Sequence, residues 1–159
     1  MTPAHLRTLC LSFNAAVEDF PFNPETSVFK VGGKLFALST LDRRPLTVNL
    51  KCDPEDAVRL RAEHPGLIVP GYHMNKRHWN TVTADGSLPD RLVRELVEDS
   101  YDLVVAGLPR ALADQVRSIG GEYLEVIVPD EQKEVSADGY AKATSEAYDR
   151  RAAELYSEQ

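Results

Sequence analysis

The chain of 159 residues is 43% hydrophobic and 27% charged, which is typical of one globular domain and not of a disordered chain. It has no apolar run near the ~20 residues that cross a bilayer, and its first residues lack the basic and apolar regions of a secretory signal. We therefore expect no membrane role. The two cysteines, Cys10 and Cys52, lie among apolar residues, which predicts reduced thiols in a cytoplasmic protein.

The net charge of -7 argues against a nucleic-acid-binding protein, since such domains are often basic. The charge is unevenly distributed. Residues 30–80 hold nine Lys or Arg and five Asp or Glu, a local charge of +4, and the rest of the chain holds nine basic and twenty acidic residues. This stretch either forms a basic surface or pairs with acidic neighbours in the fold, and the sequence leaves both readings open.

The first half of the chain predicts a helix followed by three strands. Thr2 caps a helix whose apolar stripe continues to Val17. Residues 28–31 and 34–38 flank two glycines, which is typical of a tight β-hairpin. A third strand is expected over residues 46–51, after the basic turn at residues 42–45.

The second half predicts mainly helices. A helix begins after Asp53 and ends near His64, and a strand is expected over residues 79–82. Residues 87–90 resemble a capping box before a helix that Pro109 ends, and a short helix follows to Ile119. Strands followed by helices favour an α+β fold with an antiparallel sheet.

The last forty residues differ from the rest. Residues 123–128 are expected to form a strand and residues 138–156 a helix, and the segment is acidic. We expect a domain over residues 1–119 and an acidic extension over residues 120–159 that packs on this domain or mediates association. Both a monomer and a homodimer remain open.

Catalytic and metal-binding signatures are not found in the sequence. No glycine-rich phosphate loop, nucleophile elbow or Cys-x-x-Cys pattern occurs. Cys52, His73 and His78 do not match the spacing of a zinc site. We therefore expect no catalytic residues, no metal and no cofactor, and a protein that is not an enzyme.

The segment 70–80 has the most distinctive composition, with two aromatics, two histidines, two cations and two asparagines. Lys and Arg contact phosphates, and aromatic rings stack on bases. DNA is therefore one candidate partner. The candidate nucleic-acid contacts are Arg43, Arg44, Lys51, Asn75, Lys76, Arg77 and His78. The candidate ligand-binding or loop-closing residues are Tyr72, His73, Trp79 and Asn80.

The same residues also have a structural interpretation. Trp79 is equally suited to anchor a core, and Tyr72 with the asparagines to close an irregular loop. Another protein or a small ligand, bound beside this segment, is the alternative to DNA.

Several segments carry a family resemblance, and the string Gly71–Asn80 is the most specific of them. Over roughly residues 3–118 the chain closely resembles the MmcQ/YjbR family of small bacterial proteins. The segments that carry this resemblance are residues 19–22, 28–37, 48–54, 71–80 and 100–104.

The resemblance implies a compact α+β fold whose antiparallel sheet has helices packed on one side. It also implies DNA binding through a double-wing-like surface of sheet and loops, and neither enzymatic activity nor a metal or cofactor.

Overall fold

The computed structural model describes residues 1–72 and 74–119, which form one mixed α and β unit. The strand and helix expected beyond residue 120, and with them the acidic extension, lie outside the described residues. The elements in chain order are α1 (Pro3–Leu11), β1 (Val17–Asp19), β2 (Thr26–Val31), β3 (Lys34–Thr40), β4 (Thr47–Lys51), α2 (Pro54–Glu63), β5 (Ile68–Pro70), β6 (Trp79–Thr83), α3 (Asp90–Ala106) and α4 (Arg110–Ser118).

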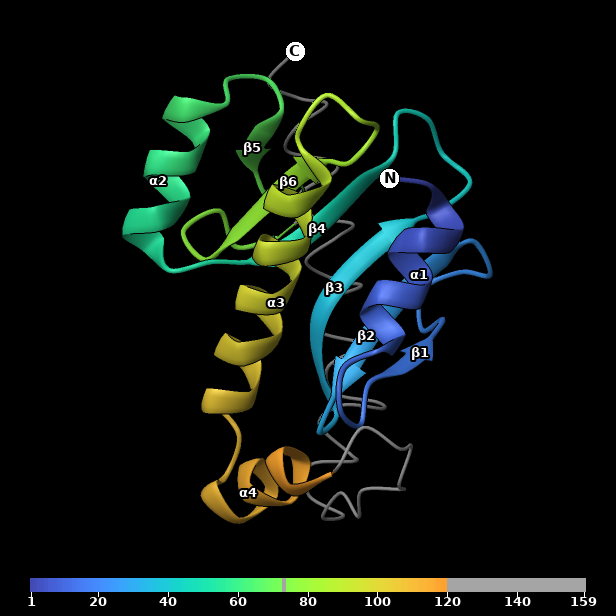
Figure 1. The fold of residues 1–159 in the computed structure, drawn as a ribbon, viewed down its shortest axis with the longest axis vertical. Helices are drawn as coiled ribbons and strands as arrows, with labels where there is room; N and C mark the ends of the chain where they lie inside the picture. Colours follow the sequence, from blue (N-terminus) through green and yellow to red (C-terminus); the bar gives the residue numbers. More distant parts are fainter. Residues whose placement is uncertain (73, 120–159) are drawn as a thin grey trace.

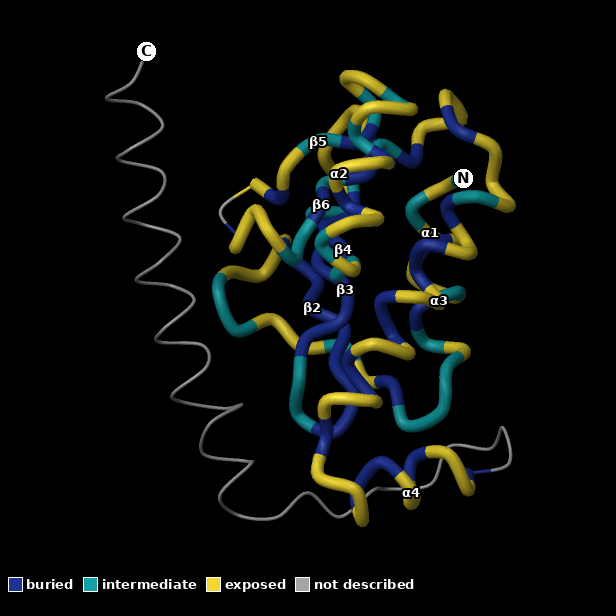
Figure 2. Tube along the Cα trace, turned by 90° about the vertical axis from the view of Figure 1, so that its left-hand side faces the viewer, coloured by how far each residue is buried: buried dark blue, intermediate teal, exposed yellow. Residues whose placement is uncertain are grey.

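The six strands form a single antiparallel sheet in the order β1-β2-β3-β4-β6-β5. Helices α1 and α3 both lie on one face of this sheet, as Figures 1 and 2 show. Helix α2 packs beside β5 at one end. The expected α+β class, with helices on one side of an antiparallel sheet, is confirmed. Within the described residues, no helix is long and apolar enough to span a membrane.

The hairpin between β2 and β3 turns at two glycines, as expected. Gly32 and Gly33 have φ angles of 56° and 80°, a region that favours glycine. A Cβ atom on Gly32 would lie 2.7 Å from Cδ1 of Leu108, so the turn also lies directly against the segment that joins α3 to α4. The hairpin is therefore held by the helical layer as well as by its own turn.

A β-bulge on β3 changes which side chains face the helices. Phe29 pairs with Ala37 but Lys30 pairs with Leu35, so Phe36 is an extra residue on β3. Both Phe36 and Ala37 belong to the main core under the helices. Phe22 and Trp79 pack against a smaller apolar cluster. The four buried side chains of this cluster are Val28, Leu35, Leu38 and Met74.

The expected helix to Val17 was wrong, because α1 ends at Leu11 and residues 17–19 form the edge strand β1. Tertiary contacts explain the early end. Phe13 stacks on Tyr101 with ring centroids 4.7 Å apart, and the Tyr101 hydroxyl donates a 2.7 Å hydrogen bond to the carbonyl of Asn14. These contacts with α3 outweigh the apolar spacing that favours a longer helix.

The expected capping box before α3 was also wrong. Pro89 is the N-cap residue, and no side chain caps this helix. The carboxylate of Asp90 instead accepts a 3.1 Å hydrogen bond from the amino terminus, and the amide of Ser87 donates to Asp85.

A buried hydroxyl joins α3 to the sheet where β3 and β4 stop pairing. Ser100 is fully buried. Its Oγ donates a 2.5 Å hydrogen bond to the carbonyl of Phe36 and accepts a 2.9 Å hydrogen bond from the amide of Lys51. The pairing of β3 with β4 covers only two residue pairs. The hydroxyl therefore satisfies one backbone group on each strand beyond that short ladder.

Replacing Ser100 by Ala is expected to destabilise the protein by about 2–3 kcal/mol, because two buried backbone groups lose their partner. Urea denaturation measures this loss. Ser118→Ala is the matched control, since among the described residues its exposed hydroxyl bonds to the carbonyl of Gln115 alone, and its removal should change stability by less than about 0.5 kcal/mol. Similar values for the two variants would show that the Ser100 bridge does not contribute as described.

Candidate functional site

The segment between β5 and β6 folds as two consecutive turns. Amide hydrogen bonds run from Met74 to the carbonyl of Gly71 over 3.2 Å and from His78 to the carbonyl of Asn75 over 3.1 Å. The side-chain Oδ1 of Asn75 accepts a 3.0 Å hydrogen bond from the amide of Arg77. Asn75 thus closes an Asx-turn that fixes the backbone under the two neighbouring cations.

The close approach of Gly71 to β6 anchors the start of this segment. Its amide donates a 2.8 Å hydrogen bond to the carbonyl of Trp79. A Cβ atom at Gly71 would lie 2.7 Å from the Cβ of Trp79 and 2.9 Å from its carbonyl oxygen. Only glycine fits here without moving the strand.

Arg61 on α2 anchors the other end of the segment. Its Nε donates a 2.7 Å hydrogen bond to Oδ1 of Asn80, and its Nη2 donates to the carbonyls of Lys76 and Trp79. A guanidinium has several donors in a rigid fork, which suits it to hold three acceptors at once. Sequence reasoning missed this residue, because an arginine in the last turn of a helix usually faces solvent.

The aromatic residues of the segment lie on and beside the sheet face away from the helices. Trp79 is half-buried and packs against the smaller apolar cluster, which supports its interpretation as an anchor. Tyr72 is 44% exposed, and its amide donates a 2.9 Å hydrogen bond to Oγ1 of Thr81. Thr81 in turn donates to Oδ1 of Asn49 over 2.6 Å. His73 lies outside the described residues.

Four of the candidate nucleic-acid contacts meet at one end of the sheet. Lys76 and Arg77 are exposed, and His78 and Lys51 are half-buried. Lys51, the last residue of β4, pairs with Trp79, and the amide of the next residue, Cys52, donates to the carbonyl of His78 over 2.8 Å. Together with Asn75, these four residues form what we call the basic end.

Arg43 and Arg44 lie away from the basic end, in the loop between β3 and β4 (Figure 1). This loop precedes β4, whereas Lys51 ends it, and the strand alone spans about 13 Å at the usual rise per residue. Nη1 of Arg44 donates to the carbonyls of Leu41 and Arg43 within its own loop. The structure does not bring the two groups of cations together into one surface.

Other cations of residues 30–80 form ion pairs with acidic residues of the same fold. Nζ of Lys30 lies 2.9 Å from Asp19, and this hydrogen bond is the main reason that the pKa of Asp19 is lowered. Arg59 pairs with Asp56 and Glu63 on its own helix at 3.4 and 3.2 Å. The interpretation that basic residues pair with acidic neighbours is therefore correct for Lys30 and Arg59.

Neither cysteine forms a disulfide. Burial raises the pKa of Cys10 to about 12 and that of Cys52 to about 11, so both thiols stay protonated near neutral pH. Among residues 1–72 and 74–119, no three His, Cys, Asp or Glu side chains are grouped as a metal site requires.

Known proteins are similar to this chain in both sequence and fold. An Escherichia coli O157:H7 protein named "Uncharacterized protein YbdF" is 44% identical over 98 residues, which cover 62% of this chain and 80% of that one. "Uncharacterized protein YjbR" of Escherichia coli K12 is 38% identical over 110 residues, or 69% of this chain and 92% of that one.

A solved structure agrees. The crystal structure of the Deinococcus radiodurans protein DR2400 superposes with a TM-score of 0.69 at 41% identity, covering 77% of this chain and 96% of the other. The family model described as YjbR matches residues 11–103, more than half of the chain. The chain therefore belongs to the YjbR family.

Proposed function

We propose that this YjbR-family protein is a non-enzymatic DNA-binding module that contacts the phosphate backbone through its basic end. The observation that carries the proposal is the exposure of Lys76 and Arg77 on a segment fixed from both sides, with Lys51 beside it. A cation on a fixed loop loses little conformational entropy when it binds a phosphate.

The charge of the described part of the chain is compatible with DNA binding. Residues 1–119 hold 14 basic and 15 acidic side chains, a net charge of -1, whereas residues 120–159 hold 4 basic and 10 acidic ones. Most of the charge of -7 therefore comes from the last forty residues. The small number of cations at the basic end implies weak binding that reads the backbone rather than the bases.

Three phosphate contacts from Lys51, Lys76 and Arg77 predict a slope of about -2.7 in a plot of log K against log salt concentration. Between 50 and 200 mM salt, affinity for a labelled duplex should then fall about 40-fold. The variant Lys76→Glu/Arg77→Glu should lose most binding at 50 mM salt, because two attractive contacts become repulsive. Fluorescence anisotropy measures both effects on the full chain.

The matched control is Arg43→Glu/Arg44→Glu, which changes the net charge equally at the loop away from the basic end. It should retain most of the affinity. Equal losses in the two double variants would contradict the basic end as the contact surface, and no binding by folded protein at 50 mM salt would overturn the DNA proposal itself.

Arg61→Lys tests whether the fixed segment matters apart from charge. The ammonium keeps the charge but cannot reach the three acceptors of the guanidinium, so we expect stability to fall by about 2 kcal/mol. DNA affinity should fall severalfold while the salt slope stays unchanged. Arg59→Lys is the control, since its exposed ion pairs contribute about 0–1 kcal/mol. Unchanged DNA affinity of Arg61→Lys would show that loop fixation plays no part.

A further inference from the structure

A groove with a volume of about 550 Å³ runs between α2 and α3, apart from the basic end. Its floor is apolar: Leu60 and Leu96 are buried, Leu92 is half-buried, and Leu103 is 37% exposed. On α3 the lining extends from Leu92 to Ala106, which corresponds to about 21 Å of helix. The groove is thus long, open and apolar at its base.

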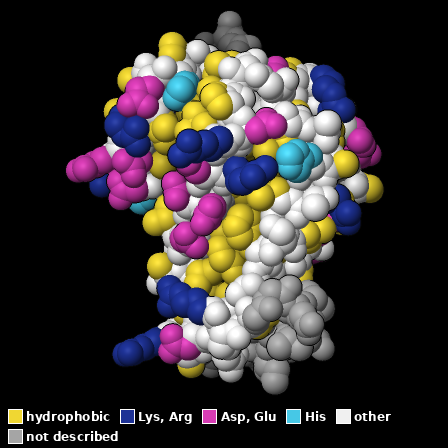
Figure 3. All heavy atoms as spheres, viewed as in Figure 1, with side chains coloured by type: hydrophobic (Ala, Val, Ile, Leu, Met, Phe, Trp, Pro, Cys, Tyr) yellow, Lys and Arg dark blue, Asp and Glu magenta, His cyan; other side chains and the backbone are white. Residues whose placement is uncertain are grey.

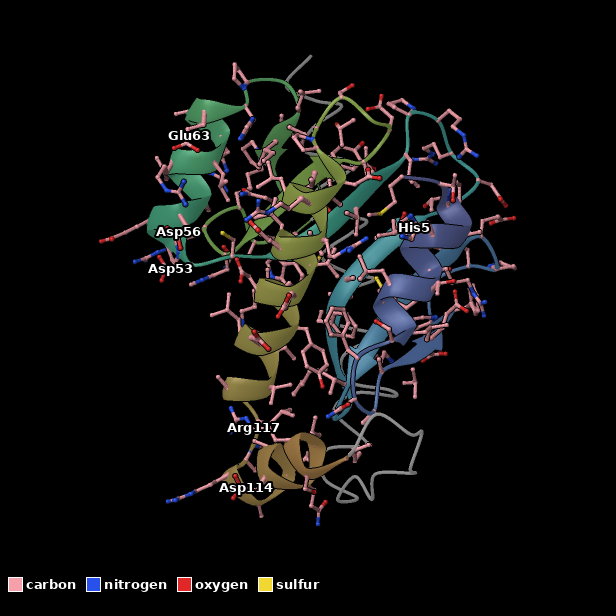
Figure 4. The ribbon with its side chains drawn as sticks, in the orientation of Figure 1. His5, Asp53, Asp56, Glu63, Asp114 and Arg117 are labelled. Carbon is pink, nitrogen blue, oxygen red and sulfur yellow. The ribbon has the colours of Figure 1, made fainter. Side chains whose placement is uncertain are left out.

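Carboxylates line both walls of this groove. On α3 they lie at positions i, i+4 and i+7, and on the other wall they come from the N-cap and body of α2. Figure 3 shows acidic side chains, interspersed with Lys and Arg, over α2 and the adjoining part of α3 beside an apolar strip, and Figure 4 labels three of the acidic residues along α2. The six are Asp53, Asp56, Glu63, Glu95, Asp99 and Asp102.

The cations of the groove do not neutralise the wall formed by α3. Arg59 is bonded to two carboxylates of its own helix, and Glu95 is paired with Arg91 outside the groove. Asp99 and Asp102 form no ion pair within the described residues. Partial burial, followed by the charges of Asp102, Glu95 and Asp56, raises the pKa of Asp99. Like charges thus face each other at a cost to the free protein.

An unpartnered buried amide lies beneath the groove. Asn80 is 2% exposed, and Arg61 holds its Oδ1, which fixes the orientation of the amide. Its Nδ2 has no hydrogen-bond acceptor in the described part of the chain. Asn80 lines a small inner hollow that shares its lining residues Cys52, Leu60, Leu96 and Asp99 with the groove. A buried donor without an acceptor is costly, and it points to an acceptor supplied from the groove.

We propose that the groove between α2 and α3 binds a basic amphipathic helix of a partner protein. The apolar side of such a helix covers the leucine floor, and its Lys or Arg side chains, spaced one turn apart, meet the acidic walls. The inner hollow has a volume of about 10 Å³, room for one water-sized atom, so an acceptor on the apolar side of that helix meets Nδ2 of Asn80 through a single bridging water.

Length and charge select this occupant over the alternatives. A small organic cation needs one or two carboxylates, whereas this groove has three of them over about two turns of α3 and three more on the wall formed by α2. Residues 120–159 of this chain carry a net charge of -6, from 10 acidic and 4 basic residues, so the acidic walls disfavour them. A basic helix from another protein matches the length, the apolar floor and the sign of the charge.

The test uses the full chain and a fluorescein-labelled 14-residue helical peptide of Leu and Lys with one apolar side. Asp99→Asn/Asp102→Asn should weaken binding about tenfold, because two of the unpaired wall charges are lost. The same variant should melt at the same or a higher temperature, since it removes repulsion. Glu98→Gln/Asp114→Asn changes the net charge equally outside the groove and should bind as the parent does.

Two further measurements distinguish binding of a helix in the groove from nonspecific attraction between opposite charges. A peptide with Leu replaced by Ser should lose binding, and in NMR spectra the side-chain amide signals of Asn80 and the backbone amides of α2 and α3 should shift on binding. Equal binding by the Ser peptide, full displacement of the peptide by spermidine, equal loss in both double variants, or shifts confined to other elements would overturn the proposal.

Discussion

The contact on which the arrangement of the sheet depends is the buried hydroxyl of Ser100. The extra residue Phe36 forms a bulge in β3, and the ladder between β3 and β4 ends next to it after two pairs. The hydroxyl bonds to Phe36 and Lys51 and so replaces the missing strand contact with one through α3. On its other edge β4 pairs with β6 over its whole length, which sets the position of Trp79 and of the cations before it.

Helix α2 connects the two surfaces that we propose are functional. Arg61 faces the segment before β6 and fixes the basic end, whereas Asp56, Leu60 and Glu63 line the groove toward α3. Asn80 belongs to both sides, since its oxygen is held by Arg61 and its nitrogen lies beneath the groove. Asn80 thus lies between the groove and the segment that carries the basic end.

The sequence predicted the fold class, the hairpin at Gly32 and the strand that ends at Lys51, because these depend on local patterns. It did not reveal the edge strand after Leu11, since stacking of Phe13 on a helix 88 residues later decides where α1 ends. The basic composition near Lys76 was visible in the sequence. That Arg43 and Arg44 lie far from Lys76 was not, because it depends on the loop before β4 and the segment before β6 lying at opposite ends of β4. Patterns along the chain carry no information about such distances.

The groove is a second feature that the composition of the sequence does not reveal. Asp56 and Asp99 each look like ordinary solvated helix charges in the sequence, and only the packing of α2 against α3 places them across one groove. Their mutual repulsion is a local cost, and natural proteins tend to carry such costs at functional sites. A net charge of -7 therefore conceals two local fields of opposite sign, one suited to phosphate and one to a cationic helix.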